Sequence, residues 1–342
     1  MYSIRELIGE LSGRTVYKIL KGDISRIVVT EHGARILGVF IGDSPNVFWT
    51  NRGLGYLIRR REWNIGGNRI WISPERRFFY KKPEEFEGWY CPRGLDPAYY
   101  RFREATNRLA VLETLVKVYD WIAEKFVTGG LIRQIRLLED GIVNGISYCR
   151  IEVMEAINVR SSSTVNLWTL TQVYPGEDGY GVVIVPTVTD SKPVHYFGPI
   201  PEDRLVVADD HVEFLIDGRS VFKLGVRPED LRMELISYLF RQHDGRYCLI
   251  VSSSHDLPRS QSECLDVAKY DPKGPRGAVQ SYNSDPELSF GEIELHFRPA
   301  VYVHRRYVSV ASHTLDIYLG VKEDIVELVK RKLGIRKITL LS

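Results

Sequence analysis

The sequence predicts an all-β protein. Between residues 14 and 320, short runs rich in Val, Ile, Tyr, Phe and Thr follow one another, separated by Gly, Asp, Asn and Pro. No segments of helical period lie between these runs, which excludes a doubly wound parallel sheet. A large β-sandwich is therefore expected, with a barrel as the alternative.

The two helices that the sequence predicts lie at its ends. In an N-terminal extension over residues 1–13, residues 3–11 suit a short helix, with Ser3 as N-cap and Glu6 in the capping-box position. Residues 321–334 place apolar side chains at helical spacing, and their acidic start and basic end suit the helix dipole. We expect this C-terminal helix to follow the last strand.

The segment 51–108 interrupts an otherwise regular series of strands. It is rich in Arg, Tyr, Trp, Gly and Pro, and such irregular insertions in compact β proteins are usually functional. We expect it to line a cleft within a single domain that spans residues 1–342. The expected strands occupy residues 15–20, 25–31, 35–41, 46–50, 109–121, 131–140, 147–159, 164–174, 181–189, 211–217, 220–226, 232–240, 246–254, 291–297 and 307–320.

Composition narrows the class of partner. The net charge is +2, from 46 basic and 44 acidic residues, so neither nucleic acid nor a membrane is expected to be bound. The start lacks the pattern of a signal peptide, and no apolar run approaches about 20 residues, which favours a cytoplasmic protein. The eight His are dispersed, so no metal and no cofactor is predicted.

The four cysteines form no CxxC pair and are expected as free thiols in a reducing compartment. Few Gln, Asn and Met accompany many Arg, Glu and Ile, which is typical of thermophiles. A disulfide between Cys248 and Cys264 is the alternative in that case.

The run GEIELHFRPA, residues 291–300, holds the most informative strand. Alternation places Glu292, Glu294 and His296 on one face, about 6.5–7 Å apart. Two carboxyl groups beside an imidazole suit general acid/base catalysis. The alternative is a solvated strand face with a Glu–His ion pair.

A second polar stretch, residues 63–77, contains Asn68, Arg69, Trp71 and Glu75. It lacks the spacing of a phosphate-binding loop. Sugars suit such a set, because their C–H faces pack on Trp rings while their hydroxyls bond to Arg, Asn and carboxylates. The alternative is a turn with one Arg–Glu pair and a buried Trp.

Two further strands carry unusual side chains. Residues 164–174 place Trp168 and Gln172 on one face, a mixture that suits a polar groove or an exposed sheet face. Lys223 lies among apolar neighbours, from where it either extends to the surface or reaches into a site. We include Trp168, Gln172 and Lys223 among the expected ligand-binding residues.

The order of these stretches resembles that of the galactose mutarotase-like superfamily. The resemblance covers about residues 14–320. It rests on the order of six runs: EHGARILGVFIGDSPNVFWTN (31–51), IGGNRIWISPE (65–75), NLWTLTQV (166–173), VIVP (183–186), FKLGV (222–226) and EIELHFRP (292–299). In aldose 1-epimerases a late strand carries the general-base Glu, with a Pro five residues later, and Glu294 and Pro299 reproduce that spacing. The resemblance implies a β-supersandwich.

The resemblance also implies an activity, the interconversion of sugar anomers with Glu294 as base and His296 assisting, and Glu292 beside them. The histidine that serves as acid in aldose 1-epimerases is missing from the strand at 164–174. His296, His243, His195 and Arg69 are the candidates to replace it.

Two other functions stay open. One is a non-catalytic carbohydrate-binding module or regulatory protein on the same fold. The other is a lyase or hydrolase, which would need Glu75 opposite Glu294. The arginines at 59–61, with Arg76 and Arg77, favour an anionic sugar as ligand, or else form a solvated face.

Overall fold

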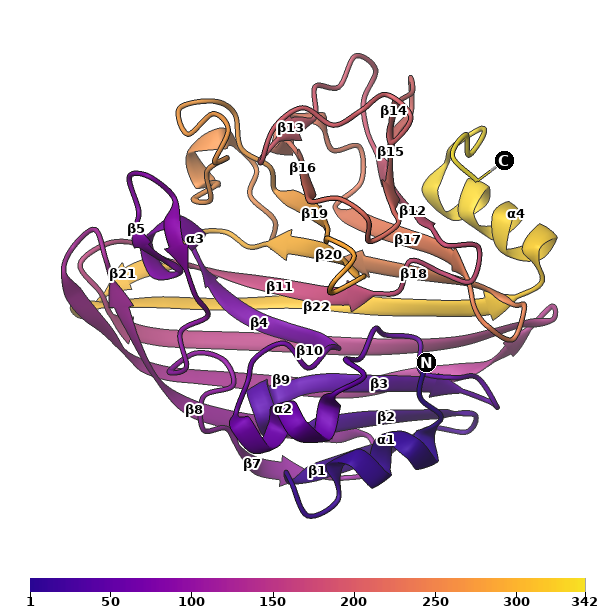
Figure 1. Cartoon of the computed structure of the whole chain (residues 1–342), viewed down its shortest axis with the longest axis horizontal. Helices are drawn as coiled ribbons and strands as arrows, with labels where there is room; N and C mark the ends of the chain where they lie inside the picture. Colours follow the sequence, from indigo (N-terminus) through magenta and orange to yellow (C-terminus); the bar gives the residue numbers. More distant parts are fainter. Residues whose placement is uncertain (342) are drawn as a thin grey trace.

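Two large antiparallel sheets pack face to face in the computed structural model, which describes residues 1–341 (Figure 1). One sheet has nine strands and the other has eleven. This arrangement confirms the predicted all-β sandwich.

The nine-stranded sheet brings together strands from both halves of the chain. Its strands, in spatial order, are β1 (Tyr17–Lys21), β2 (Ser25–Thr30), β3 (Arg35–Ile41), β4 (Asn68–Ser73), β11 (Asn166–Val173), β20 (Gly291–His296), β19 (Val279–Asn283), β16 (Phe222–Val226) and β13 (Val194–His195). The strands β4, β11 and β20 lie at its centre, so the polar stretches that are far apart in sequence become neighbours.

The eleven-stranded sheet contains the longest strands. Its path is β14 (Leu205–Val207), β15 (His211–Ile216), β12 (Gly181–Pro186), β17 (Leu235–Arg241), β18 (Tyr247–Ser253), β22 (Arg306–Gly320), β10 (Ile146–Arg160), β9 (Lys125–Val143), β8 (Leu109–Asp120) and β7 (Arg101–Ala105), and β21 (Val301–Val303) pairs with β22. Burial alternates along β8 and β10, as expected for strands with one solvated face.

Apolar side chains from both sheets form one core. Ile70 of β4 and Ile293 and Leu295 of β20 belong to the same cluster as Leu315 and Ile317 of β22. The odd-numbered residues of β20 thus face the second sheet, and the even-numbered residues face away from it. The carboxylates of β20 lie on the outer face of the nine-stranded sheet.

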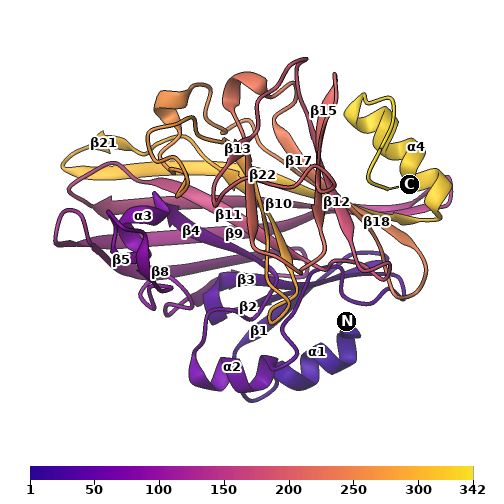
Figure 2. The same ribbon diagram turned by 45° about the horizontal axis from the view of Figure 1, so that its top comes forward.

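The two predicted helices are confirmed. Helix α1 (Ile4–Leu11) begins after Ser3, and both hydrogen bonds of the capping box with Glu6 are present. Helix α4 (Lys322–Leu333) ends at Gly334 in the left-handed conformation, and its apolar face packs on the outer side of β17 and β18. Figure 2 shows α1 beside α2 (Leu54–Arg60) under β1 to β3, where both helices bury leucines in one cluster.

The structure differs from the sequence prediction in several places, and it contains strands that were not predicted, among them β19 of the nine-stranded sheet. Residues 46–50, predicted as a strand, form none: Thr50 alone makes an isolated bridge with Gly66. The segment 51–108 is not an insertion throughout, because it contains the inner strand β4. The rest of it includes α2, α3 (Glu75–Phe78), the hairpin of β5 (Tyr80–Lys82) and β6 (Glu87–Trp89), and the edge strand β7.

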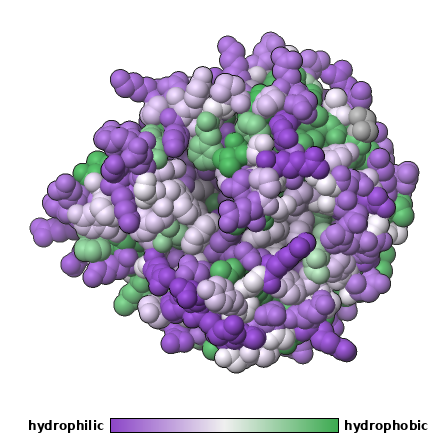
Figure 3. All heavy atoms as spheres, viewed as in Figure 1, coloured by the Kyte–Doolittle hydropathy of each residue, from purple (hydrophilic) through white to green (hydrophobic). Residues whose placement is uncertain are grey.

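All four cysteines are buried and unpaired, which rejects the disulfide between Cys248 and Cys264. Over residues 1–341, no helix is both long enough and apolar enough to cross a membrane. Strongly hydrophilic residues surround the face seen in Figure 3, with less polar residues between them.

Candidate functional site

A cavity of about 310 Å³ lies on the outer face of the nine-stranded sheet. Strands β4, β11, β20, β19 and β16 form its floor, and the segment 51–108 supplies one wall. Seven of the ten residues predicted from the sequence line this cavity: Arg69, Trp71, Glu75, Trp168, Lys223, Glu292 and Glu294.

Lys223 joins two carboxyl groups at the centre of the cavity. Its Nζ lies 3.1 Å from Oε2 of Glu294 and 3.9 Å from Oε2 of Glu75. Burial lowers the pKa of Lys223, but Glu294 and Glu75 outweigh burial and leave that pKa above its ordinary value. Lys223 is therefore a buried ammonium that faces both carboxyl groups.

The two carboxyl groups have opposite pKa shifts. Burial alone would raise the pKa of Glu294, but the charge of Lys223 and a contribution from His296 hold it below its ordinary value. Burial raises the pKa of Glu75 to about 7, because Lys223 compensates only partly and Asp266 adds repulsion. At neutral pH Glu294 is ionised while Glu75 is partly protonated, the pattern of a base beside an acid.

A second ion pair lies beside the first. Nη2 of Arg69 donates to Oε1 of Glu292 over 2.5 Å, and the guanidinium carbon lies 4.2 Å from the centre of the Trp71 ring. Burial raises the pKa of Glu292 although Arg69 opposes the shift. Among residues 1–341, Nε and Nη1 of Arg69 are buried donors without a hydrogen-bond partner.

Tryptophan rings form the walls of the cavity. The ring centres of Trp63 and Trp71 lie 5.6 Å apart, and those of Trp71 and Trp168 lie 5.4 Å apart. The indole nitrogens are used as well: Trp168 Nε1 donates to Glu294 over 3.0 Å, and Trp89 Nε1 donates to Glu75 over 2.8 Å. The rings therefore position both carboxyl groups.

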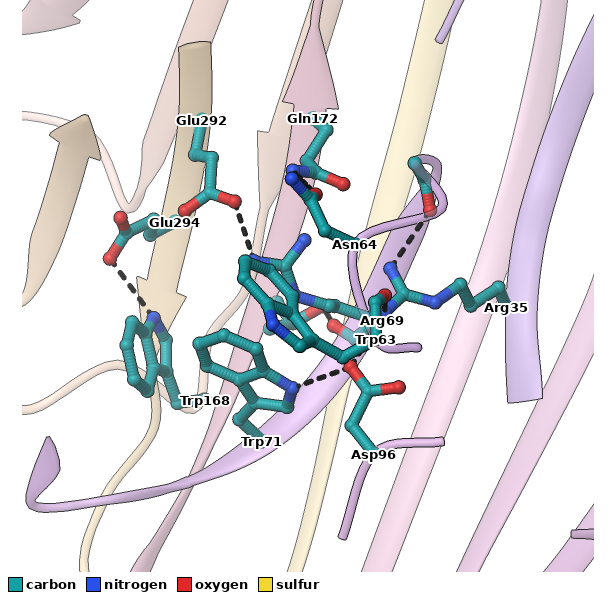
Figure 4. Close-up of polar contacts among 12 residues, drawn as sticks. Arg35, Trp63, Asn64, Arg69, Trp71, Asp96, Trp168, Gln172, Glu292 and Glu294 are labelled. Atoms are coloured by element: carbon teal, nitrogen blue, oxygen red, sulfur yellow. Dashed lines mark hydrogen bonds and ion pairs between the residues drawn. The ribbon is translucent and has the colours of Figure 1, made fainter. Parts of the chain in front are cut away.

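A buried ion pair behind the wall holds Trp71 in place (Figure 4). Oδ2 of Asp96 accepts hydrogen bonds from Trp71 Nε1 over 2.8 Å and from Arg35 Nη2 over 2.6 Å. Arg35 also donates to the carbonyl oxygen of Gly66, over 2.9 Å, in the turn before β4. Both charged side chains are almost fully buried, so the pair anchors the turn and the indole together.

Sequence reasoning missed several lining residues, including Trp63, Trp89, Phe197 and Tyr282. The abundance of Trp in the segment 51–108 was the only signal for the first two. Phe197 and Tyr282 come from β13 and β19 regions that carried no polar motif. Phe197 and Tyr282 line the cavity because of the order of the strands in the nine-stranded sheet.

Asn68 does not line the cavity. Successive residues of a strand point to opposite faces, so Asn68 faces the second sheet while Arg69 faces the cavity. The Asn68 amide donates to the hydroxyls of Thr169 and Thr171 and is bonded by Arg133 of β9. Its place is in the polar part of the sandwich interior.

Gln172 and His296 are also outside the cavity lining. Gln172 donates to Asn64 over 2.9 Å, beside Glu292 (Figure 4). The His296 ring stacks on Trp168 with centres 4.9 Å apart and is 1% exposed. Its Nε2 lies 3.6 Å from Glu294, so it contributes to the surroundings of that carboxylate rather than contacting a ligand.

The remaining candidates for the acid or for an anion site lie elsewhere. His195 and His243 do not line this cavity. The arginines at 59–61 do not line it either, while Arg76 pairs with Glu84 and Arg77 with Asp120. The expected basic cluster is therefore not part of the site.

A second cavity, of about 790 Å³, adjoins the first and shares Leu288 with it. It is the larger of the two. The smaller one is the better candidate for catalysis, because the smaller one holds the buried carboxyl groups with shifted pKa values.

Comparisons with known proteins place the fold. A protein described as galactose mutarotase-like, from Lactobacillus casei, superposes with a TM-score of 0.53 at 12% identity, over 89% of this chain and 100% of that one. The chain has the galactose mutarotase-like fold. A candidate aldose 1-epimerase from Escherichia coli K12 superposes with a TM-score of 0.53, at 9% identity, over 89% of this chain and 99% of that one.

Comparison of the sequence itself with known families and proteins is less informative. Residues 143–244 match the model of a family of unknown function (DUF6786). No curated protein matches the sequence significantly. At such identities the likeness establishes the fold, and a function must be argued from the site.

Proposed function

We propose that the protein binds a sugar in the smaller cavity and interconverts its anomers by general acid/base catalysis. The observation that carries this proposal is the pair Glu294 and Glu75, which face one ammonium group with pKa values shifted in opposite directions. A catalyst that works at neutral pH needs the pKa of its base to lie below the pKa of its acid, so that one group is ionised while the other is protonated.

In the proposed reaction, ionised Glu294 takes the proton of the anomeric hydroxyl while protonated Glu75 gives its proton to the ring oxygen. The bond between the anomeric carbon and the ring oxygen breaks and leaves an open-chain aldehyde. Rotation about the next carbon–carbon bond, followed by the reverse steps, closes the other anomer. Both carboxyl groups return to their starting states, so no cofactor is required.

Glu75 takes the role of acid in this proposal in place of His296. Glu75 lines the cavity, whereas the His296 ring is covered by Trp168. A proton donor must reach the reacting oxygen directly or through one water. We propose that His296 acts only through Glu294.

The proposed ligand is a neutral sugar. Three carboxyl groups, Glu75, Glu292 and Glu294, face two cations, Arg69 and Lys223, so the cavity has no surplus positive charge for a phosphate or a uronate. The rings of Trp63 and Trp71 offer faces for C–H groups, and the free nitrogens of Arg69 offer donors for hydroxyls.

The experiment is exchange spectroscopy by NMR on galactose, glucose and xylose, with and without the protein. Wild type is expected to accelerate anomer exchange, and Glu294→Gln is expected to lower the rate at least 100-fold. Glu104→Gln, at an exposed residue outside both cavities, is the control and is expected to behave as wild type. Saturation-transfer measurements in the same tubes report binding. If the wild-type protein neither binds these sugars nor accelerates their anomer exchange, the proposal is overturned.

A second candidate is non-catalytic sugar recognition. The observation that favours it is the ion pair of Glu294 with Lys223, because a carboxylate with a lowered pKa is a weaker base. Binding without acceleration by wild type would select this function.

A further inference from the structure

The larger cavity adjoins the proposed sugar site, and the two are called the outer and the inner cavity below. Leu288, in the loop between β19 and β20, lines both cavities. Trp49 lines the larger cavity and Phe290 the smaller one, and their ring centres lie 4.8 Å apart. The two hollows are therefore separated by a thin partition of side chains and not by a layer of the fold.

The lining of the larger cavity resembles a sugar site in its chemistry. Trp49 and Tyr174 provide aromatic surface, and Asn51, Arg52 and Arg219 provide hydrogen-bonding groups. Within residues 1–341, the guanidinium groups of Arg52 and Arg219 form no salt bridge and no hydrogen bond, so their donors are free for ligand oxygens. Asp217, the buried carboxylate there, is already paired with Arg204 over 2.7 Å.

The two volumes differ in what they can hold. The inner cavity, at about 310 Å³, is at the lower end of the range for small-molecule sites and suits one sugar ring. The outer cavity, at about 790 Å³, is more than twice as large and has room for further rings. A ligand of one ring would leave the outer cavity unused.

We propose that the protein acts on reducing oligosaccharides, with the reducing-end unit in the inner cavity and the next unit in the outer cavity. This inference rests on the proposed function. The orientation follows from the chemistry, because the free anomeric hydroxyl must reach Glu294 and Glu75. The glycosidic link to the second unit then leaves the inner cavity past Leu288.

The test compares anomer exchange of lactose, cellobiose and maltose with that of galactose and glucose by NMR. For wild type, kcat/KM for at least one disaccharide is expected to exceed that of its monosaccharide tenfold or more. The double variant Arg52→Ala/Arg219→Ala is expected to lose this advantage while keeping the monosaccharide rate. Arg59→Ala/Arg60→Ala, two exposed arginines outside both cavities, is the matched control.

A second variant keeps the test independent of the arginines. Leu288→Trp narrows the passage and is expected to reduce disaccharide exchange selectively. Exchange of monosaccharides without a disaccharide preference would overturn the inference and leave the proposed function standing. Hydrolysis of the disaccharide would overturn it by assigning the outer cavity to a leaving group, and absence of any sugar exchange or binding would overturn both.

Discussion

Glu75 sets the expected pH dependence of the reaction. Burial raises its pKa to about 7, so the protonated acid is lost as the pH rises through that value. Glu294 has a lowered pKa and stays ionised down to acidic pH. We expect kcat/KM for anomer exchange to be level from about pH 5 to 6.5 and to fall roughly tenfold per unit above about pH 7.

NMR exchange measured between pH 4.5 and 9 checks this profile. Glu75→Gln is expected to lower the rate at pH 6 and to remove the alkaline decline, because the titrating group is gone. An unchanged decline in that variant would assign the pKa to another group.

The same carboxyl group affects stability. The pKa of Glu75 in the folded protein is about 7, above its ordinary value of 4.5. Between these two pH values the folded state therefore binds more protons than the unfolded state. Stability from this group is full below about pH 4.5 and is lost as the pH rises through 7. As the pH rises from 4.5 to 8, the free energy of unfolding of Glu75→Gln is therefore expected to increase relative to that of wild type by on the order of 1–3 kcal/mol.

Urea unfolding of wild type and Glu75→Gln at pH 4.5 and at pH 8 measures this difference in the free energy of unfolding. Glu85→Gln, on an exposed residue of the same segment, should show no comparable change. An equal pH dependence in Glu75→Gln and wild type would contradict the assignment.

Residue-level prediction succeeded where strand alternation decided the outcome. The face of β20 that carries Glu292 and Glu294 followed from a period of two. Asn68 was misplaced because a motif was interpreted as a unit, although its neighbours on a strand point in opposite directions. His296 shares the correct face but is covered by Trp168, a contact between strands that sequence spacing does not encode.

At the scale of elements, local signals were sufficient for the helices. The capping box of α1 and the amphipathic face of α4 depend on residues within a few positions of each other. The run 46–50 has strand-forming residues, but its backbone makes only scattered bonds, among them those from Val47 to Val39 of β3 and from Trp49 to Gln172 of β11, and no continuous ladder. Strand β4 was hidden in an irregular context, since its place in the sheet depends on pairing with β11.

The cap of α1 provides a quantitative test. The Ser3 hydroxyl accepts a hydrogen bond from the backbone N–H of Glu6, and the Glu6 carboxylate accepts one from the backbone N–H of Ser3. Ser3→Ala is expected to reduce the free energy of unfolding by about 1 kcal/mol. Ser12→Ala, at the other end of α1, is the control and should cost less than about 0.5 kcal/mol.

Thermal or urea unfolding is the measurement. A cost for Ser3→Ala no larger than for the control would show that α1 is held by Leu7 and Leu11 alone.

At the scale of the molecule, the two sheets share a buried charged cluster. Arg133 of β9 lies 3.3 Å from Glu155 of β10, which lies 3.4 Å from His313 of β22, and all three are fully buried. Arg133 also donates to the carbonyl oxygens of Ala34 and Asn68, in and beside the opposite sheet. This cluster ties the two sheets together beneath strand β4.

Removing one charge from the cluster leaves the other uncompensated. Glu155→Gln is expected to reduce the free energy of unfolding by about 3–5 kcal/mol. Glu113→Gln, which breaks an exposed pair with Arg103, should cost at most about 1 kcal/mol. Equal losses in the two variants, measured by urea unfolding, would contradict a structural role for the buried pair.

The whole fold was predictable because many weak motifs appeared in one order along the chain. An activity was not predictable in the same way, because a fold shared at 9–12% identity does not determine the chemistry of a site. The proposed acid is the clearest example, since the strand at 164–174 has no histidine and Glu75 of α3 lines the cavity.

The burial of every cysteine makes the protein suitable for site-specific labelling. Desolvation raises the pKa of the thiols of Cys91, Cys149, Cys248 and Cys264, so almost none is thiolate at neutral pH. A maleimide dye is therefore expected not to react with the folded wild-type protein. A cysteine introduced at exposed Glu287, beside the partition between the cavities, would take up one dye and report by fluorescence when a ligand arrives.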